Sequence, residues 1–382
     1  MESTKIDFLY LNEQDMIKAG VLDASMCIQV MGETMALLSK GDYIMGGPNH
    51  NAHGIMLEFP KKSYIPNFPL NNSRDRRFIA MPAYLGGRFH IAGQKWYGSN
   101  GRNAQHGLPR SILMVSLNDV ETGIPIAYMS ANLLSAMRTG AMPGLAAKLL
   151  ARKDSKVLSI VGPGAINKAC TMAIMSCFPN IETVKIKGSS PESKTAKKMK
   201  KFVESRYFNV KNIKICSTLE EAIRGADIVS EAASVKEGQW PKYEREWFKP
   251  GAVIISASTF NMEHKSIMDI KKVVDDYSMY EDYSNEDPVV FDKNLNRKPT
   301  GCMGEDFVNM VKDGLIERKS IINLGDIVTG KAPGRTSDDE VILVAIEGLP
   351  IEDVAWGYEC YQNALKKGLG IKLNLWDRSA II

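Results

Sequence analysis

Residues 157–167 read VLSIVGPGAIN, an apolar stretch that runs directly into a turn with two glycines and then into a helix-like segment. A turn of this kind lets the backbone approach a pyrophosphate, and the start of the helix offers free N–H groups and a positive partial charge. The pattern G-x-G-x-x-G is incomplete, because Asn167 stands where the third glycine normally permits close packing of helix on strand. An ordinary strand-to-helix turn is the alternative. The chemistry we expect is the binding of nucleotide phosphates by Gly162, Gly164, Ala165 and Ile166.

Composition places the chain among globular proteins: 382 residues give room for two domains, with 44% hydrophobic and 24% charged residues. The net charge is +4, and the lysines are dispersed except in residues 194–201, which indicate a solvated helix face. This charge makes no case for nucleic acid or a membrane as partner. We expect no signal peptide, no metal site and, from six scattered cysteines, a reducing cytoplasm.

The first third of the chain predicts a helix followed by a sheet. Apolar residues recur at helical spacing over 23–40, and Gly41 is a plausible helix end. The turn pairs 118–119 and 122–123 are hairpin signals, so the sheet should be antiparallel or mixed. The strands expected in it are 78–84, 89–96, 111–117 and 124–128.

From residue 133 onward the pattern changes to a helix over 133–150 and then to alternating strands and helices. This alternation predicts an α/β fold with a doubly wound parallel sheet. Residues 282–304 are polar and are expected to form an inserted loop, and a last strand over 340–346 is expected to rejoin the first domain. The strands expected in the parallel sheet are 157–161, 183–187, 213–215, 228–229, 253–255 and 273–274, with helices at 192–206 and 219–224.

Several short motifs, in order along almost the whole chain, resemble the ornithine cyclodeaminase/mu-crystallin family. They are MPAY at 81–84, GQKW at 93–96, DVETGIP at 119–125, RTGA at 138–141, the glycine turn, and IED at 351–353. Further stretches resemble the branch of N-(2-amino-2-carboxyethyl)-glutamate dehydrogenases: IAMPAY at 79–84, KWYGS at 95–99, SAMRT at 135–139, VVDDYS at 273–278 and LNL at 373–375. The motifs are specific together and not singly.

The resemblance implies a central Rossmann domain, residues 132–330, and a split α+β domain for substrate binding and dimerisation, residues 1–131 and 331–382. It implies a homodimer. It also implies hydride transfer between a nicotinamide cofactor and the carbon of a C–N bond in an amino acid, an imino acid or an N-substituted amino acid.

Arg138 is the first candidate for substrate binding. A guanidinium grips a carboxylate through two parallel hydrogen bonds. By resemblance Arg138 holds the substrate's α-carboxylate, and Thr139 reaches a cofactor phosphate. An inter-domain salt bridge is the alternative for Arg138, and a hydrogen bond to its own helix is the alternative for Thr139.

Lys95 lies in an otherwise apolar stretch beside Trp96. Partial burial and a positive neighbour would lower the pKa of its ammonium group and make it a usable proton shuttle. By resemblance it contacts the substrate carboxylate or activates the amine or a water, whereas a strand lysine reaching to solvent is the alternative. The other residues assigned to substrate binding are Met81, His53 and Arg110, the last of which matches an arginine of the same branch and could meet a second carboxylate.

The end of the second strand of the nucleotide domain bears on the choice of cofactor. NAD-specific domains carry an acidic residue there for the ribose 2′-hydroxyl, but residues 185–191 read KIKGSSP and contain none. Ser189, Ser190 and Lys194 could instead hold a 2′-phosphate. We therefore expect NADP(H), with NAD(H) as the alternative, and assign Ala233 to the cofactor site as well.

Two departures from the family bear on the reaction. Cyclodeaminases carry an aspartate after the strand at 253–255, whereas residues 256–262 here contain no carboxylate. An arginine common in the loop after the first long helix is also absent between residues 43 and 72, where Asn49, His50, Asn51 and His53 stand instead.

We expect a dehydrogenase or reductase acting at a C–N bond. The alternatives are an ornithine cyclodeaminase-type ammonia-lyase, in which no net redox change occurs, and a mu-crystallin-like ketimine reductase or ligand-binding protein.

Overall fold

The computed structural model describes residues 4–73, 75–235, 239–258, 260–286 and 300–380. The chain forms two compact units. Unit 1 comprises residues 1–23, 40–138 and 349–382, and unit 2 comprises residues 24–39 and 139–348. No single helix of the described residues is long and apolar enough to cross a membrane, although one bent pair, 13–19 with 24–40, passes by length and composition alone.

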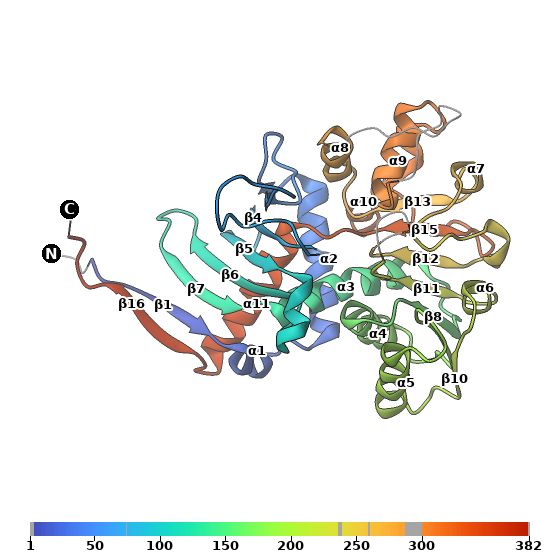
Figure 1. The fold of residues 1–382 in the computed structure, drawn as a ribbon, viewed down its shortest axis with the longest axis horizontal. Coiled ribbons are helices and arrows are strands. Elements are labelled where there is room, and N and C mark those ends of the chain that lie inside the picture. Colours follow the sequence, from blue (N-terminus) through green and yellow to red (C-terminus); the bar gives the residue numbers. More distant parts are fainter. Residues whose placement is uncertain (1–3, 74, 236–238, 259, 287–299, 381–382) are drawn as a thin grey trace. The chain divides into compact units, whose positions relative to one another are not determined.

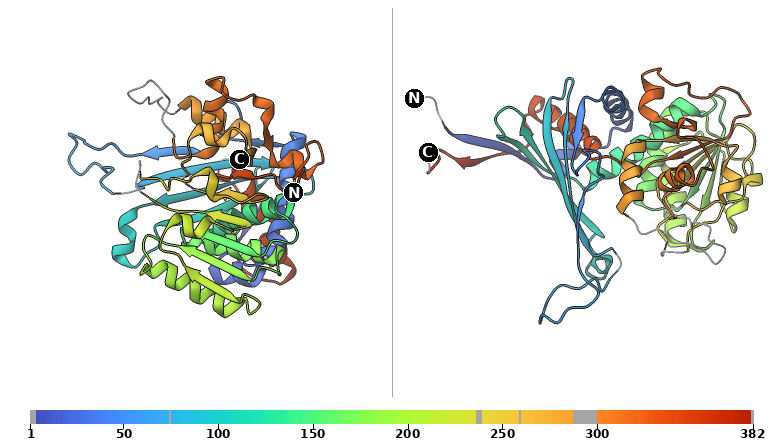
Figure 2. Two further views of the ribbon diagram at one scale, coloured as in Figure 1. Left: turned by 90° about the vertical axis from the view of Figure 1, so that its right-hand side faces the viewer. Right: turned by 90° about the horizontal axis from the view of Figure 1, so that it is seen from above.

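Unit 2 is built on a parallel sheet in the order β10-β9-β8-β11-β12-β15-β13-β14. Its central strands β8, β11 and β12 consist mainly of valine, isoleucine and leucine, because helices cover both faces of such a sheet (Figure 2). The predicted doubly wound parallel sheet is therefore confirmed. The strands are β8 (Val157–Val161), β9 (Thr183–Lys187), β10 (Asn212–Ile215), β11 (Ile228–Glu231), β12 (Val253–Ser256), β13 (Lys271–Val274), β14 (Ile321–Asn323) and β15 (Ile342–Ala345).

The helices of unit 2 follow the strands and pack closely where glycine allows it. A Cβ atom at Gly140 would lie 2.4 Å from the carbonyl carbon of Ala169, so α3 and α4 meet there backbone to backbone. The helices are α2 (Ala24–Lys40), the second part of α3 (Asn132–Leu150), α4 (Ala165–Cys177), α5 (Lys194–Arg206), α6 (Leu219–Ile223), α7 (His264–Ile267), α8 (Tyr277–Glu286), α9 (Met303–Lys312) and α10 (Leu324–Val328), with short 3-10 turns η2 (Arg245–Trp247) and η3 (Arg318–Ser320).

Unit 1 is built on a mixed sheet in the order β16-β1-β7-β6-β5-β4-β2, with β3 also paired to β4 (Figure 1). Helix α11 (Pro350–Lys366) packs against β4, β5 and β6, and α1 (Glu13–Ala19) packs against α11. The other elements are β1 (Ile6–Leu11), β2 (Tyr43–Met45), β3 (Ile55–Glu58), β4 (Arg77–Leu85), β5 (Ile91–Ser99), the 3-10 turn η1 (Gly101–His106), β6 (Ser111–Asp119), β7 (Pro125–Ser130) and β16 (Ile371–Trp376).

The two faces of this sheet differ in burial. Along β4 the odd-numbered residues from 79 to 85 are buried beneath α11, and the even-numbered residues lie on the other face. The alternation follows from the two-residue period of a strand. Lys95 belongs to the buried face, and Trp96 to the exposed one.

The last strand corrects the predicted domain boundaries. Residues 340–346 were expected to rejoin the first domain, but β15 pairs in parallel with β12 and β13 inside the sheet of unit 2. Residues 331–348 and 24–39 therefore belong to unit 2, and the chain returns to unit 1 only at Leu349. The strand is apolar along its whole length, which fits the centre of a parallel sheet rather than the half-exposed sheet of unit 1.

The expected loop at 282–304 is wrong at both ends. Residues 282–286 complete α8, and Met303 begins α9, while 287–299 lie outside the described residues. Both helices bury apolar side chains, including Tyr280 and Phe307, and this tertiary packing outweighs the polar composition. The short strands β1, β2, β3 and β16 and helix α1 were not predicted.

Candidate functional site

The glycine turn of unit 2 has the backbone geometry that only glycine adopts easily. Gly162 has φ +77°, and a Cβ atom there would lie 2.4 Å from Cα of Ala233. The Gly162 N–H donates to the carbonyl of Lys187 at 3.0 Å, so the turn lies beside the end of β9. Ala233 and the carboxyl ends of β8 and β9 thus surround one point at the edge of the sheet.

Asn167 holds this turn in place of the missing third glycine. Its side chain is fully buried, and Nδ2 donates to the carbonyl oxygens of Val161 at 2.7 Å and Gly162 at 3.0 Å. Its Oδ1 accepts a hydrogen bond from Ser230 Oγ at 2.6 Å. The side chain therefore ties α4 to β8 and β11. The incomplete glycine pattern is a different solution to helix–strand packing and not a defect in it.

The start of α4 fits a dinucleotide phosphate. Gly164 is the exposed N-cap residue with no capping side chain, and a Cβ atom there would meet nothing within 4 Å. Ala165 is exposed and Ile166 half-buried, and within the described part of the chain their N–H groups donate no hydrogen bond. Unpaired N–H groups at an open helix start suit an anion.

The loop after β9 presents hydroxyl groups and a lysine. Ser189, Ser190 and Lys194 are all exposed. The nearest carboxylate, Glu192, forms an exposed ion pair with Lys197. The remaining residues assigned to the cofactor are Thr139, half-buried in α3, and Ala233, buried against Gly162.

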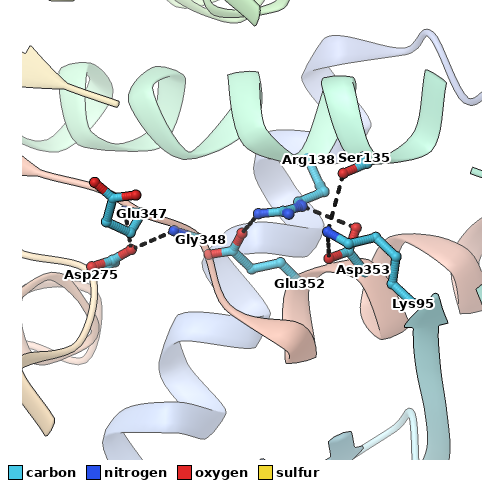
Figure 3. A network of polar contacts seen from close by, with 8 residues as sticks. All are labelled: Lys95, Ser135, Arg138, Asp275, Glu347, Gly348, Glu352 and Asp353. Carbon is cyan, nitrogen blue, oxygen red and sulfur yellow. Dashed lines mark hydrogen bonds and ion pairs between the residues drawn. The ribbon is translucent and has the colours of Figure 1, made fainter. Parts of the chain in front are cut away.

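Unit 1 contains a buried cluster of four charged side chains (Figure 3). Lys95 Nζ donates to Asp353 Oδ2 at 2.7 Å and to Ser135 Oγ at 3.3 Å. Lys95 stands on β5 in register with Met81 of β4 and Val115 of β6, which are both fully buried. The ammonium group is therefore surrounded by apolar side chains on its own sheet and meets its carboxylate partner on α11.

Arg138 joins the same cluster from α3. Its Nε donates to Asp353 Oδ1 at 3.1 Å, and its Nη1 donates to Glu352 Oε2 at 2.8 Å. Two cations thus face two carboxylates, and the cluster, which we call the charge cluster (Lys95, Arg138, Glu352, Asp353), has no net charge. Among the hydrogen bonds between described residues, Arg138 Nη2 takes part in none. The contacts of this guanidinium with the described residues thus use Nε and Nη1.

Burial and mutual charge set the pKa values of the cluster. Burial, and then Arg138, lower the pKa of Lys95 to about 8, against the opposing effect of Asp353. Burial alone would raise the pKa of Asp353, but Arg138 and Lys95 lower it below its usual value. The pKa of Arg138 is raised, because Asp353 and Glu352 outweigh the effect of burial. Lys95 is the member able to exchange a proton near neutral pH.

The local sequence explains how α11 brings its two acids to this position. Pro350 opens the helix, where its missing N–H costs nothing. Glu352 and Asp353 follow in the first turn, where the helix dipole favours negative charge. On α3, Ser135 and Arg138 are three residues apart and so share one face of that helix.

Sequence reasoning missed part of this cluster. The IED motif was noticed, but neither Glu352 nor Asp353 was assigned to the site, and Ser135 was noted only within a longer motif. Two acids in the first turn of a largely apolar helix were the available signal. Glu231, a fully buried carboxyl group at the end of β11, was missed as well.

Among the described residues, no hydrogen bond or ion pair joins Arg110 to the charge cluster. Arg110 is exposed and forms an ion pair with Asp75 at 2.7 Å. His53 is half-buried beside Gly54, whose Cβ position lies 2.9 Å from Met81 Cγ. Across the described residues no group of three or more histidine, cysteine, aspartate or glutamate side chains could hold a metal ion.

A parallel sheet of this order with a glycine turn at its carboxyl edge, joined to a second α+β unit, defines a two-unit protein of the Rossmann dehydrogenase class. The chain belongs to the ornithine cyclodeaminase/mu-crystallin family, whose model matches residues 21–368.

Three relatives illustrate this membership. The chain is 30% identical over 375 residues to the N-((2S)-2-amino-2-carboxyethyl)-L-glutamate dehydrogenase of Staphylococcus aureus, covering 97% of this chain and 99% of the relative. The Delta(1)-pyrroline-2-carboxylate reductase of Thermococcus litoralis, solved with NADH and L-proline, is similar with a TM-score of 0.75 and 25% identity, over 95% of this chain and 99% of that one. An archaeal alanine dehydrogenase dimer with bound NAD has a TM-score of 0.74 and 27% identity, over 97% and 100%.

Proposed function

We propose that this protein is an NAD(P)-dependent oxidoreductase that acts on the C–N bond of an amino acid, an imino acid or an N-substituted amino acid. The charge cluster is the observation that carries the proposal, because it combines a titratable amine with a guanidinium nitrogen left for an anion. In this scheme unit 1 binds the substrate and unit 2 binds the dinucleotide.

Arg138 binds the substrate's α-carboxylate through Nη2. Its other contacts, to Glu352 and Asp353, fix the plane of the guanidinium before the substrate arrives. Fixing this plane in advance reduces the entropy lost on binding. An incoming carboxylate brings one negative charge to a neutral cluster. The oxidised nicotinamide, when bound, supplies a balancing positive charge and the position that accepts or returns hydride.

Lys95 moves the proton. In the oxidative direction hydride leaves Cα and an imine forms, and neutral Lys95 takes a proton from the water that adds to it. The product then separates into a keto acid and an amine, so that the substrate, NAD(P)⁺ and water yield keto acid, amine, NAD(P)H and a proton. In the reverse direction protonated Lys95 supplies that proton. A pKa of about 8 allows both states near neutral pH.

The dinucleotide is placed at the glycine turn of unit 2. Gly162, Gly164, Ala165 and Ile166 contribute backbone, Ala233 lies against Gly162, and Thr139 of α3 is assigned to a cofactor phosphate by the family resemblance. We further propose that NADP(H) is preferred over NAD(H), because exposed Ser189, Ser190 and Lys194 follow β9 and the one nearby acid, Glu192, pairs with Lys197. Two related structures hold NADH and NAD.

In this scheme the substrate carries a second carboxylate in addition to its α-carboxylate. Met81, beside Lys95 in the sheet, forms an apolar wall, and half-buried His53 and exposed Arg110 belong to the same unit. An exposed arginine suits a second carboxylate, as an N-substituted amino acid would bring.

The protein is proposed to be a homodimer that associates through unit 1. The face of its sheet away from α11 exposes Phe78, Trp96, Ile112 and Tyr128, and the rings of Phe78 and Trp96 stack at 5.6 Å. Apolar side chains gathered on one face are typical of a protein–protein interface. The cytoplasm is the proposed location, since all six cysteines are free thiols.

Ornithine cyclisation is the less favoured activity. The segment after β12 carries Phe260, stacked on Tyr243 at 4.2 Å, and residues 256–262 include no acid. A member of the family that only binds its ligand is also less favoured, because both Lys95 and Arg138 stand in one hydrogen-bonded cluster.

The test is a screen for net cofactor turnover by absorbance at 340 nm, run separately with NADPH and NADH. Keto acids and cyclic imines are offered with and without amino acids as the partner amine. Oxidation of a reduced cofactor by one imine, or by one keto acid with its amine, is the expected result, with the higher rate for NADPH. Ornithine converted to ammonia and proline without net change in absorbance would overturn the proposal in favour of the cyclodeaminase.

A further inference from the structure

Glu231 is a fully buried carboxyl group that the proposed reaction does not use. It ends β11, directly beside Ser256 at the end of β12 in the parallel register. Its Oε1 accepts a hydrogen bond from the N–H of Ala233 at 2.6 Å, and its Oε2 lies 3.1 Å from Ser256 Oγ. A buried acid of this kind needs either a positive partner or a proton of its own.

The number of hydrogen atoms in this network indicates which of the two applies. Ser256 Oγ also lies 3.2 Å from the carbonyl oxygen of Ser258, so one hydroxyl hydrogen faces two acceptors. If Glu231 is ionised, one of these two contacts lacks a hydrogen. If Glu231 is protonated, its O–H donates to Ser256 Oγ, and the Ser256 O–H then donates to Ser258. Only the protonated acid satisfies both contacts.

The surroundings agree with a neutral acid. Among the described residues, the titratable groups that interact with Glu231 are Glu347 after β15, Tyr243, and Cys170 of α4, and none of these three is a cation. Within the described part of the chain, no lysine, arginine or histidine is among the causes that shift its pKa. Burial therefore raises the pKa of Glu231 to about 8.

The network joins two loops to the glycine turn. Ser258 Oγ, in the loop after β12, donates to the carbonyl oxygen of Ala233 at 2.9 Å. The N–H of Ala233 donates to Glu231, so both backbone polar groups of Ala233 are hydrogen-bonded. Ala233 in turn lies against Gly162, with no room for a side chain between them. The position of Ala233 therefore limits where the backbone of the glycine turn at Gly162 can lie.

We propose that Glu231 is a positioning residue for the dinucleotide, which in its protonated form fixes the loop of Ala233 against Gly162 and on ionisation releases it and weakens cofactor binding. The inference rests on the proposed function, because it assumes that the glycine turn binds the dinucleotide. Glu231 touches neither substrate nor cofactor in this scheme. It links the strength of cofactor binding to pH above neutrality.

The test compares the dissociation constant of NADPH and NADH for the full-length wild type and Glu231→Gln between pH 6.5 and 9.5, by quenching of protein fluorescence. Glutamine keeps the acceptor for Ala233 and places an N–H where the protonated acid has its O–H, so E231Q copies the neutral state. If only the protonated form binds well, the wild-type dissociation constant rises about tenfold from pH 7 to pH 9. E231Q should bind like the wild type at pH 7 and keep that affinity at pH 9.

Two controls isolate the effect. Glu182→Gln changes an exposed acid of the same unit whose pKa is lowered to about 2 by Lys156 and Lys211, so E182Q should retain the wild-type pH dependence. Ser256→Ala removes the acceptor for the Glu231 proton, and S256A should weaken binding already at pH 7.

A second readout needs no cofactor. Because the folded pKa of Glu231 lies above its usual value of 4.5, stability is lost as the pH rises from about 4.5 through 8. The melting temperature of the wild type should therefore fall relative to E231Q over this range.

Parallel profiles of the wild type and E231Q in either measurement, or weak binding by E231Q at every pH, would overturn the positioning role. Failure of the wild type to bind either dinucleotide at any pH would instead overturn the proposed function, and this inference with it.

Discussion

Two fully buried carboxyl groups, Asp353 in unit 1 and Glu231 in unit 2, have opposite fates in this protein. Asp353 accepts hydrogen bonds from Lys95 and Arg138, and its pKa lies below the usual value. Glu231 accepts a hydrogen bond from the backbone N–H of Ala233 and lies 3.1 Å from the Ser256 hydroxyl, to which its protonated form donates, and its pKa is raised to about 8. Burial is the same in both places, so the difference lies in the partners.

The comparison separates two ways of building a site. In unit 1 the cations keep a carboxylate ionised, and in the proposed function the assembled charges bind and protonate the substrate. In unit 2 the proposed arrangement has a neutral acid, and the geometry of the backbone binds the cofactor. Substrate binding in unit 1 should therefore depend on charged side chains, and cofactor binding in unit 2 should depend on the shape of the backbone.

The largest effect is expected from removing the positive side of the charge cluster. Arg138→Ala deletes the proposed carboxylate grip and leaves Glu352 and Asp353 with fewer counter-charges. We expect kcat/KM to fall by about 10³-fold or more, measured from initial rates at 340 nm. Arg138→Lys should recover little, because an ammonium group cannot reproduce the planar contacts.

The matched control is Arg88→Ala. Arg88 is an exposed arginine that forms an ion pair at 2.9 Å with Glu359, a residue of α11, the helix that also carries Glu352 and Asp353. Exposed pairs of this kind contribute at most about 1 kcal/mol, so activity should stay within about twofold. Equal losses in R88A and R138A would contradict the role given to the charge cluster.

The second effect tests shape in unit 2. Gly162→Ala places a Cβ atom 2.4 Å from the backbone of Ala233 at a residue with φ +77°. We expect the dissociation constant of the dinucleotide to rise by about tenfold or more, with substrate affinity less affected. Fluorescence titration with NADPH and NADH measures it.

Gly41 offers a control of the same backbone conformation. It also has φ +77°, but a Cβ atom there would meet nothing within 4 Å. Gly41→Ala should cost about 1 kcal/mol of stability through strain alone and leave cofactor binding unchanged. If both alanine variants bind the dinucleotide like the wild type, the contact between Gly162 and Ala233 has no functional weight.

The third effect concerns Asn167 and tests whether the fold needs the third glycine of the G-x-G-x-x-G pattern or the hydrogen bonds of the asparagine. Asn167→Gly restores the third glycine of the pattern, yet it removes the contacts to Val161, Gly162 and Ser230. We expect a loss of about 1–3 kcal/mol in the free energy of unfolding, measured in urea, and weaker cofactor binding. Improved binding by N167G would show that the glycine pattern, and not this hydrogen-bonded replacement, is what the fold requires.

The smallest effect is the pH dependence that Lys95 should confer. Its pKa is lowered to about 8, so the neutral amine becomes the main form as the pH rises through that value. The oxidative rate should therefore rise through pH 8, and the reductive rate should fall, by up to about tenfold between pH 7 and 9. Recording both directions in E231Q removes the opposing contribution of Glu231. A profile that runs in the same direction for both reactions would exclude Lys95 as the proton carrier.

The two regions also differ in how far the sequence predicts them. The glycine turn was found because its strand, turn and helix follow one another within residues 157–177, and local spacing determines their geometry. The charge cluster joins residues 95, 138, 352 and 353 through tertiary packing alone. Lys95 and Arg138 came from a family resemblance, while their carboxylate partners could not be assigned without the fold.

The boundary errors have the same origin. The sequence of β15 does not indicate which sheet the strand joins, because its apolar residues would suit the centre of the sheet of unit 1 or of unit 2. Residues 282–286 and 303–304 belong to helices α8 and α9 although the polar stretch 282–304 favours a loop, since packing decides such segments. Elements whose type follows from local apolar periodicity could be predicted. The sheet or core that an element joins depends on distant residues and could not.

The most direct test of the central claim follows a hydride label. Once the 340 nm screen identifies a reacting pair, NAD(P)H carrying deuterium at both hydrogen positions of nicotinamide C4 is supplied with it, and the product is analysed by mass spectrometry and NMR. The account predicts one deuterium at Cα of the amino acid product, formed at close to the wild-type rate by R88A and about 10³-fold more slowly by R138A. A product without deuterium at Cα, formed at the wild-type rate, would contradict it.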